Sequence, residues 1–115
     1  ICGFSPRMRL DLSVNMLTMQ ALKNKKITVF GGNQIRPNIH INDLVDLYIF
    51  LISNKIKPGT YNAGFENMKI IEIAKMVQKI IKSEIIISKS NDPRSYRLDS
   101  SKIINLNNFQ TIVCL

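Results

Sequence analysis

The residues best placed to do chemistry follow a short β-branched segment. Residues 27–30 (Ile-Thr-Val-Phe) are typical of a strand, and this pattern stops at Gly31-Gly32. Glycine lets the backbone approach a ligand closely, and the nearby Arg36 offers a planar fork of N–H donors that suits a phosphate or diphosphate. The segment therefore predicts an anion held at the mouth of an α/β fold. The alternative for Arg36 is a surface ion pair with Asp43 or Asp46.

The histidine and the cysteines predict no further chemistry. His40 is the only histidine, and it alternates with the apolar Ile39 and Ile41. Because the sequence places no carboxylate or cysteine partner beside it, we expect a structural histidine, hydrogen-bonded to the backbone or to a carboxylate. Cys2 and Cys114 lie near opposite ends without metal-ligand spacing, so we expect reduced thiols rather than a disulfide, and no metal site.

Composition indicates one modest domain with a small core. The chain has 115 residues, 45% of them hydrophobic, and a formal net charge of +8. The lysines are scattered, and no nucleic-acid motif or interleaving of aromatic and basic residues accompanies them, so a solvated basic surface is favoured over nucleic-acid binding. No apolar run is long enough to span a bilayer.

Helical and strand patterns alternate along the chain, which predicts an α/β fold. One expected helix, starting at a cap on Asn42 or Asp43 and ending near residue 54, is apolar nearly all round and should be buried between other elements. The other expected elements are helices over 11–24 and 70–82, strands at 27–30, 60–63 and 84–88, an extended loop over 90–97, and a short helix from Ser100 or Ser101.

Four segments, in order and in register, resemble the extended short-chain dehydrogenases, the family of NAD-dependent nucleotide-sugar epimerases and dehydratases. They are distributed along nearly the whole chain, at residues 5–9, 29–43, 59–64 with 71–74, and 91–103. The resemblance implies a Rossmann-type fold, tightly bound NAD in the full-length enzyme and a nucleotide-diphosphate sugar as substrate.

Two parts of that family's machinery are missing from the sequence. There is no Gly-x-Gly-x-x-Gly loop between a strand and a helix. There is no Tyr-x-x-x-Lys pair either, because the positions four after Tyr48, Tyr61 and Tyr96 hold Ile52, Phe65 and Ser100. Residues 1–115 therefore resemble a partial, C-terminal nucleotide-sugar-binding portion whose N-terminal dinucleotide-binding part is absent. We expect no catalysis from the chain alone. Relatives often carry a Ser or Thr cap where Lys69 stands, so we expect that helix end to fray. The C-terminal residues 110–115 also lack the family's usual closing helix.

The resemblance implies two arginines on one diphosphate. Arg36 and Arg94 match this pair, and Arg97 is the competitor of Arg94 for the second role. Asp99 and Lys102 are expected to hold the last helix in place.

Six further residues have both a ligand role and a structural role open to them. By resemblance Asn15 reaches a ligand phosphate or ribose, although a structural hydrogen bond is equally compatible with its place beside an apolar stripe. Thr28, Val29 and Phe30 resemble a strand edge beside the nucleobase, with a plain core strand as the alternative. Arg7 and Arg9 either touch the sugar or cap the fold.

The function expected is therefore substrate binding within an NAD-dependent sugar epimerase or dehydratase, an isomerase or lyase of carbohydrate biosynthesis. A cytoplasmic location and a homodimer of the full-length protein accompany that expectation. The alternative is a stand-alone basic α/β module that binds phosphate-containing ligands or RNA.

Overall fold

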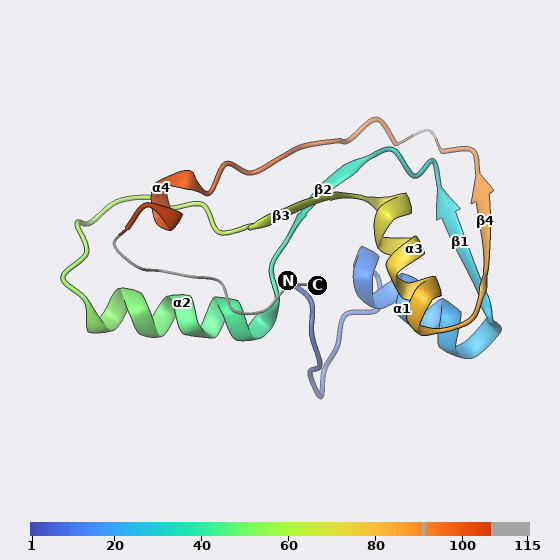
Figure 1. Ribbon diagram of the computed structural model, residues 1–115, viewed down its shortest axis with the longest axis horizontal. Helices are drawn as coiled ribbons and strands as arrows, with labels where there is room; N and C mark the ends of the chain where they lie inside the picture. Colours follow the sequence, from blue (N-terminus) through green and yellow to red (C-terminus); the bar gives the residue numbers. More distant parts are fainter. Residues whose placement is uncertain (91, 107–115) are drawn as a thin grey trace.

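The computed structural model describes residues 1–90 and 92–106, and the chain that it describes is elongated (Figure 1). Its extents are 48 × 30 × 23 Å, and its radius of gyration is 15.9 Å. A compact chain of this length would have a radius of about 13 Å. Two separate hydrophobic clusters explain the difference. One lies around the helices α1 (Ser13–Asn24) and α3 (Ile70–Ile80), and the other lies beside the helix α2 (Ile41–Ser53).

The larger cluster belongs to a two-stranded parallel sheet covered by two helices. Strand β1 (Lys26–Phe30) pairs in parallel with β4 (Glu84–Ser88), and α1 (Ser13–Asn24) and α3 (Ile70–Ile80) pack together against it. In β1 the side chains of Ile27 and Val29 are fully buried, because alternate residues of a strand point to the same face. The predicted α/β class and the strand at 84–88 are confirmed.

A second, antiparallel pair joins the two clusters. Strand β2 (Ile35–Asn38) pairs with β3 (Glu66–Lys69), and α3 follows β3 directly. The strand predicted at 60–63 is wrong, because this segment finds no strand partner. Its neighbourhood is held by side chains instead: Asn62 Nδ2 donates to the Asp99 carbonyl oxygen at 3.2 Å, and the Gly64 N–H donates to Ser100 Oγ at 3.1 Å.

The N-cap of helix α2 (Ile41–Ser53) lies two or three residues before the caps predicted at Asn42 or Asp43. The N-cap is His40, whose Nδ1 accepts from the Asn42 N–H at 3.2 Å. An imidazole nitrogen can satisfy an N–H of the first helical turn as a carboxylate would, which the sequence pattern did not reveal. The structural role predicted for His40 is confirmed.

The prediction that α2 is buried between other elements is wrong. One side contacts the second cluster through Leu47, which is 3% exposed. The opposite side presents Val45, Tyr48, Ile49 and Ile52 to solvent. These four residues follow the i, i+3, i+4, i+7 spacing of a single helical face. In the described part of the chain, elements cover α2 on one side only, as Figure 1 shows.

The two remaining predictions about helix ends had different outcomes. Helix α4 (Ser101–Ile104) starts after Ser100, as predicted, and Asp99 and Lys102 anchor it. Asp99 Oδ1 accepts from the Ser101 N–H at 2.9 Å, and Lys102 Nζ donates to the Thr60 carbonyl oxygen at 2.7 Å. At the start of α3 the Lys69 N–H is satisfied by Glu72 Oε2 at 2.8 Å, so that end is capped rather than frayed. Residues 110–115 and Cys114 lie outside the described residues.

Candidate functional site

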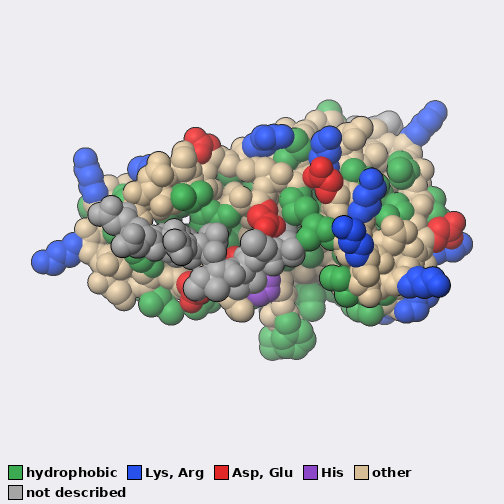
Figure 2. Space-filling view, in the orientation of Figure 1, with side chains coloured by type: hydrophobic (Ala, Val, Ile, Leu, Met, Phe, Trp, Pro, Cys, Tyr) green, Lys and Arg blue, Asp and Glu red, His purple; other side chains and the backbone are tan. Residues whose placement is uncertain are grey.

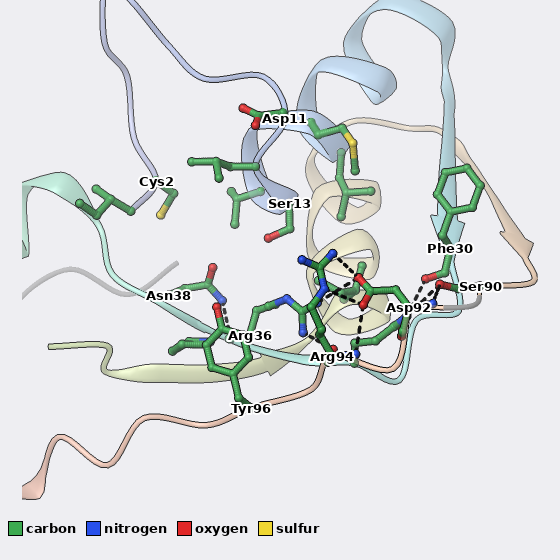
Figure 3. Close-up of a pocket in the computed structure, with 18 of the residues that line it drawn as sticks. Cys2, Asp11, Ser13, Phe30, Arg36, Asn38, Ser90, Asp92, Arg94 and Tyr96 are labelled. Carbon is green, nitrogen blue, oxygen red and sulfur yellow. Dashed lines mark hydrogen bonds and ion pairs between the residues drawn. The ribbon is translucent and has the colours of Figure 1, made fainter. Parts of the chain in front are cut away.

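A cavity of about 630 Å³ opens where β1 ends, and we call it the main cavity (Figure 3). Its walls come from the N-terminal segment, the start of α1, strands β1 and β2, and the loop after β4. This volume is in the range of small-molecule sites. The polar and charged residues among those that line it are Asp11, Ser13, Thr28, Gln34, Arg36, Asn38, Ser90, Asp92, Arg94 and Tyr96.

Two glycines shape the turn that leads from β1 into the cavity wall. Gly31 and Gly32 have φ angles of +76° and +99°, a region that favours glycine. A Cβ on Gly32 would lie 3.2 Å from side-chain atoms of Val29 and Ile71, so the turn is also closely packed. The two glycines are thus required by the structure of the tight turn that connects β1 to β2.

Gln34 joins this turn to the loop after β4. Its Oε1 accepts from the Gly32 N–H at 2.8 Å, and its Nε2 donates to the Phe30 carbonyl oxygen at 3.2 Å and to Ser90 Oγ at 3.4 Å. The Gly31 N–H also donates to the Ser88 carbonyl oxygen at 2.8 Å. These bonds fix two segments that lie more than fifty residues apart in the sequence.

Both predicted diphosphate arginines lie in the wall of the main cavity, and one carboxylate contacts them both (Figure 3). Arg94 donates from Nε and Nη2 to the two oxygens of Asp92 at 2.7 and 2.8 Å. Arg36 Nη2 lies 3.6 Å from Asp92 Oδ2. Arg36 therefore has its ion pair with Asp92, where the sequence had suggested Asp43 or Asp46.

Backbone contacts also hold Arg36. Its Nη1 donates to the carbonyl oxygens of Ile35 and Arg94, and its guanidinium carbon lies 5.3 Å from the centre of the Tyr96 ring, a cation–π contact. Asn38, which is 7% exposed, donates from Nδ2 to the Arg36 carbonyl oxygen at 2.9 Å. Arg36 thus ties β2 to residues 94–96.

The electrostatics of this cluster favour an anion. Hydrogen bonds from the Arg94 side chain lower the pKa of Asp92 to about 2, with a smaller contribution from the charge of Arg36. Asp92 is therefore ionised at neutral pH. Two guanidinium groups and one carboxylate leave the cluster with a net charge of +1. Of the other acids, Asp11 also lines the cavity, and Arg9 lowers its pKa by a hydrogen bond and neutralises it.

The structure brings some of the predicted site residues together and leaves others apart. Arg36, Arg94, Thr28 and Phe30 line the main cavity. Arg97 is exposed and is not among the lining residues.

The strand edge offers less backbone than expected. The Thr28 N–H is already bonded to Gln20 Oε1 at 2.8 Å, and Val29 is a core residue with no exposed surface. Phe30 is 55% exposed, so its ring is the part of this edge most accessible to a ligand.

Asn15 lies in a second cavity of about 420 Å³ beside the N-terminal loop, together with Arg7 and Arg9. Its Nδ2 donates to the Arg9 carbonyl oxygen at 2.9 Å, which is the structural hydrogen bond considered as the alternative. Cys2 lies between the two cavities and lines both. It is a free, buried thiol whose Sγ is 3.5 Å from the Ile39 carbonyl oxygen, and burial raises its pKa.

The polar residues of the main cavity that sequence reasoning missed include Gln34, Asn38 and Asp92. Gln34 and Asn38 make contacts that no local pattern encodes. The contact of Asp92 could have been found in the sequence, because an Asp two residues before Arg94 can accept hydrogen bonds from both the backbone N–H and the guanidinium group of Arg94.

The described residues contain no group of three or more His, Cys, Asp or Glu side chains that could hold a metal ion. Within the same residues, no helix is long and apolar enough to cross a bilayer.

Comparisons with known proteins agree on one family. Residues 4–64 match the model of the NAD dependent epimerase/dehydratase family. An ADP-L-glycero-D-manno-heptose-6-epimerase of Brachyspira hyodysenteriae is 33% identical over 70 residues, which are 58% of this chain and 22% of the relative.

Solved structures of similar fold include a UDP-glucuronic acid 4-epimerase from Bacillus cereus, in complex with UDP-glucuronic acid and NAD. It has a TM-score of 0.76 and 27% identity, and the match covers 96% of this chain and 38% of the epimerase. An NAD dependent NDP-hexosamine 5,6-dehydratase matches with a TM-score of 0.73 at 21% identity, over 94% of this chain and 37% of its own. The chain thus spans well under half the length of these relatives.

The described residues do not fit the NAD pyrophosphate. In a dinucleotide-binding fold the glycine-rich turn leads from a strand into a helix whose N-terminus receives the phosphates. Here Gly31-Gly32 lead from β1 into another strand, β2. The family match covers more than half of the chain, and the fold is that of Rossmann-type members of the same family. The chain belongs to the NAD dependent epimerase/dehydratase family.

Proposed function

We propose that residues 1–115 are the substrate-binding portion of an NAD-dependent nucleotide-sugar epimerase or dehydratase, and that the main cavity binds the nucleoside diphosphate of the substrate. The observation that carries this proposal is the convergence of Arg36 and Arg94 on one wall of the cavity, from segments 58 residues apart. Two guanidinium groups can each bond a diphosphate at two points and neutralise its charge.

The rest of the cavity supports a nucleotide. Phe30 offers an accessible ring near Thr28, as a stacking surface for a base. The Bacillus cereus relative was solved with UDP-glucuronic acid, a nucleotide sugar, and with NAD. In this proposal Arg97 and Asn15 are secondary candidates, because neither lines the main cavity.

Binding of the diphosphate would supply energy at a distance from the reacting sugar carbon. Interactions with non-reacting parts of a substrate orient the reacting part and lower the entropic cost of the chemical step. The redox step itself would use NAD and a Tyr-x-x-x-Lys pair. This sequence contains neither a glycine-rich loop to bind NAD nor that pair. Isomerase or lyase activity, a role in carbohydrate biosynthesis, a cytoplasmic location and a homodimer are parts of the proposal for the longer protein.

A polyanion-binding module is the weaker candidate. Figure 2 shows Lys and Arg side chains spread over the visible face rather than gathered into one groove. In the main cavity Asp92 already neutralises one of the two arginine charges.

Titration calorimetry with UDP, dTDP, GDP and ADP, their monophosphates, and an RNA oligomer tests the proposal. We expect one nucleoside diphosphate to bind more tightly than its monophosphate, with a weak dependence on salt. Preference for the RNA, with affinity falling steeply as salt rises, would contradict the proposal.

A further inference from the structure

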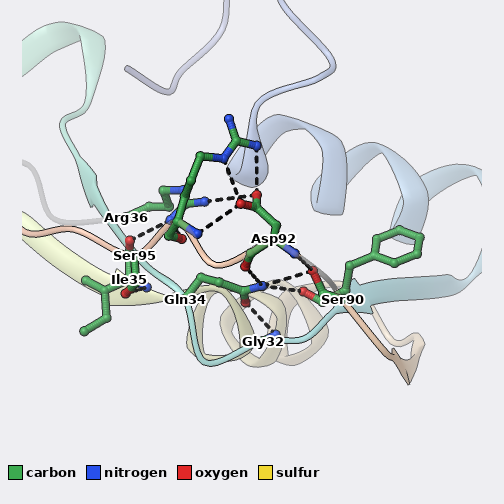
Figure 4. Close-up of polar contacts among 9 residues, drawn as sticks. Gly32, Gln34, Ile35, Arg36, Ser90, Asp92 and Ser95 are labelled. Atoms are coloured by element: carbon green, nitrogen blue, oxygen red, sulfur yellow. Dashed lines mark hydrogen bonds and ion pairs between the residues drawn. The ribbon is translucent and has the colours of Figure 1, made fainter.

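Asp92 is the meeting point of the two arginines of the main cavity. Its Oδ2 accepts from Arg94 Nη2 at 2.8 Å and lies 3.6 Å from Arg36 Nη2, while its Oδ1 accepts from Arg94 Nε at 2.7 Å. The carboxylate lies in the middle of the cluster, with Arg36 on one side and Ser90 on the other (Figure 4). One carboxylate therefore sets the positions of both guanidinium groups.

The contacts with Asp92 leave each arginine with donors for a ligand. A guanidinium has two edges that can bond an anion at two points, Nε with Nη2 and Nη1 with Nη2. Arg94 uses the Nε–Nη2 edge on Asp92. Arg36 directs Nη1 at two carbonyl oxygens. Arg36 Nη2 is paired with Asp92. Among the described residues, no acceptor contacts Arg94 Nη1 or Arg36 Nε, so the Nη1–Nη2 edge of Arg94 and the Nε donor of Arg36 remain for a ligand.

The backbone holds Asp92 in place. The Asp92 N–H donates to Ser90 Oγ at 3.1 Å, and Oδ1 accepts from the Arg94 N–H at 3.0 Å across Pro93, whose ring restricts the turn. The Arg94 side chain is 78% exposed and would otherwise be free to rotate. Ordering such a side chain on binding costs conformational entropy, and a fixed partner removes part of that cost in advance.

We propose that Asp92 is a positioning residue for diphosphate binding, which holds Arg36 and Arg94 with their remaining donors directed to the ligand. This inference rests on the proposed function. The alternative is that Asp92 competes with the ligand: its carboxylate would repel the diphosphate and occupy arginine donors that the ligand needs. The geometry favours positioning, because Asp92 uses an edge of Arg94 and leaves the other free.

The test compares Asp92→Asn with the wild-type chain by calorimetry, using the tightest-binding of UDP, dTDP, GDP and ADP and the corresponding monophosphate. Asparagine keeps the size of the side chain and an oxygen for the Arg94 N–H, but loses the charge. We expect diphosphate affinity to fall about ten-fold, with a smaller loss for the monophosphate, so that selectivity between them decreases. Asp92→Glu, which restores the charge, should recover part of the loss.

Two controls separate positioning from a structural effect. Asp99→Asn removes another carboxylate of the same segment, one that is bonded to Ser101 and lies outside the main cavity, and should leave both affinities unchanged. In an Arg94→Ala background, Asp92→Asn should lose most of its effect, because its main partner is gone.

Tighter or unchanged binding by Asp92→Asn would overturn the inference, and so would an undiminished effect in the Arg94→Ala background. An equal loss for monophosphate and diphosphate would overturn it as well. If the wild-type chain binds no nucleoside diphosphate, both this inference and the proposed function fail. If it binds one and Arg94→Ala weakens that binding while Asp92→Asn does not, only this inference fails.

Discussion

Arg36 holds the backbone of the loop that carries Arg94. Its Nη1 donates to the Arg94 carbonyl oxygen across 58 residues of sequence, and its guanidinium lies over the ring of Tyr96. The two arginines therefore differ in kind. Arg36 is only 21% exposed and is bonded on several sides, whereas the Arg94 side chain is 78% exposed and is held by Asp92 alone among the described residues.

The first prediction concerns Arg94. Arg94→Ala should weaken binding of a nucleoside diphosphate roughly 10- to 100-fold, because it removes a charge-assisted, two-point contact. The melting temperature should fall only modestly, because the side chain is mostly exposed and the change removes only its contact with Asp92. Calorimetry and a thermal melt on the same preparation check both parts.

Arg97→Ala is the matched control for Arg94, three residues along the same loop but outside the main cavity. We expect nearly wild-type affinity. Arg94→Lys should restore binding only in part, because an ammonium group lacks the fork geometry. If Arg97→Ala is the damaging change and Arg94→Ala is silent, the assignment of this loop is wrong.

The second prediction is that Arg36→Ala loses both affinity and stability. It removes a proposed ligand contact and also the hydrogen bonds that fix residues 94–96 to β2. Its effect and that of Arg94→Ala should not add in the double variant, because the two side chains share Asp92. Additive losses in a double-mutant cycle would show that the two arginines act independently.

The third prediction follows from the low pKa of Asp92. The Arg94 hydrogen bonds lower that pKa from 3.8 to about 2, so the ionised carboxylate stabilises the folded chain above pH 3.8. This contribution is lost as the pH falls through about 2. Urea unfolding of Asp92→Asn should therefore depend less on pH across this interval than unfolding of the wild type. A carboxyl NMR titration with the Asp92 midpoint at or above 3.8 would contradict it.

The fourth prediction concerns helix α2. Leu47→Ala should cost about 2–4 kcal/mol of unfolding free energy, because Leu47 is 3% exposed and packs against the second cluster. Ile52 lies on the opposite side of the same helix and is 84% exposed, so Ile52→Ala should cost less than about 0.5 kcal/mol. Denaturant unfolding of the two variants compares these losses.

With one side of α2 open to solvent, the chain alone should also be marginally stable. A cooperative melt well above about 65 °C would contradict this expectation.

The fifth prediction is that the 115-residue chain alone has no epimerase, dehydratase or oxidoreductase activity. The Gly-rich cofactor loop and the Tyr-x-x-x-Lys pair are both absent from its sequence. Incubation with NAD and UDP-, dTDP- or GDP-sugars, followed by chromatography of the products, should show no turnover. Conversion of any of these substrates would refute the division of labour proposed for the longer protein.

Sequence patterns predicted those features that depend on neighbouring residues. The β-branched residues of 84–88 and the amphipathic period of 70–82 led to β4 and α3, because a strand or helix pattern is a local property. The strand at 66–69 was missed, because pairing with β2 selected it over 60–63. The central position of Asp92 could not be predicted, since it requires Arg36 and Arg94 to meet in space.

The central claim is that Arg36 and Arg94 bind one diphosphate in the main cavity. A crystal structure of the protein with its tightest-binding nucleoside diphosphate tests this claim directly. The account predicts donor atoms of both guanidinium groups about 3 Å from diphosphate oxygens, with Asp92 still bonded to Arg94. A diphosphate held by other residues, with Arg36 and Arg94 remote from it, would contradict the account.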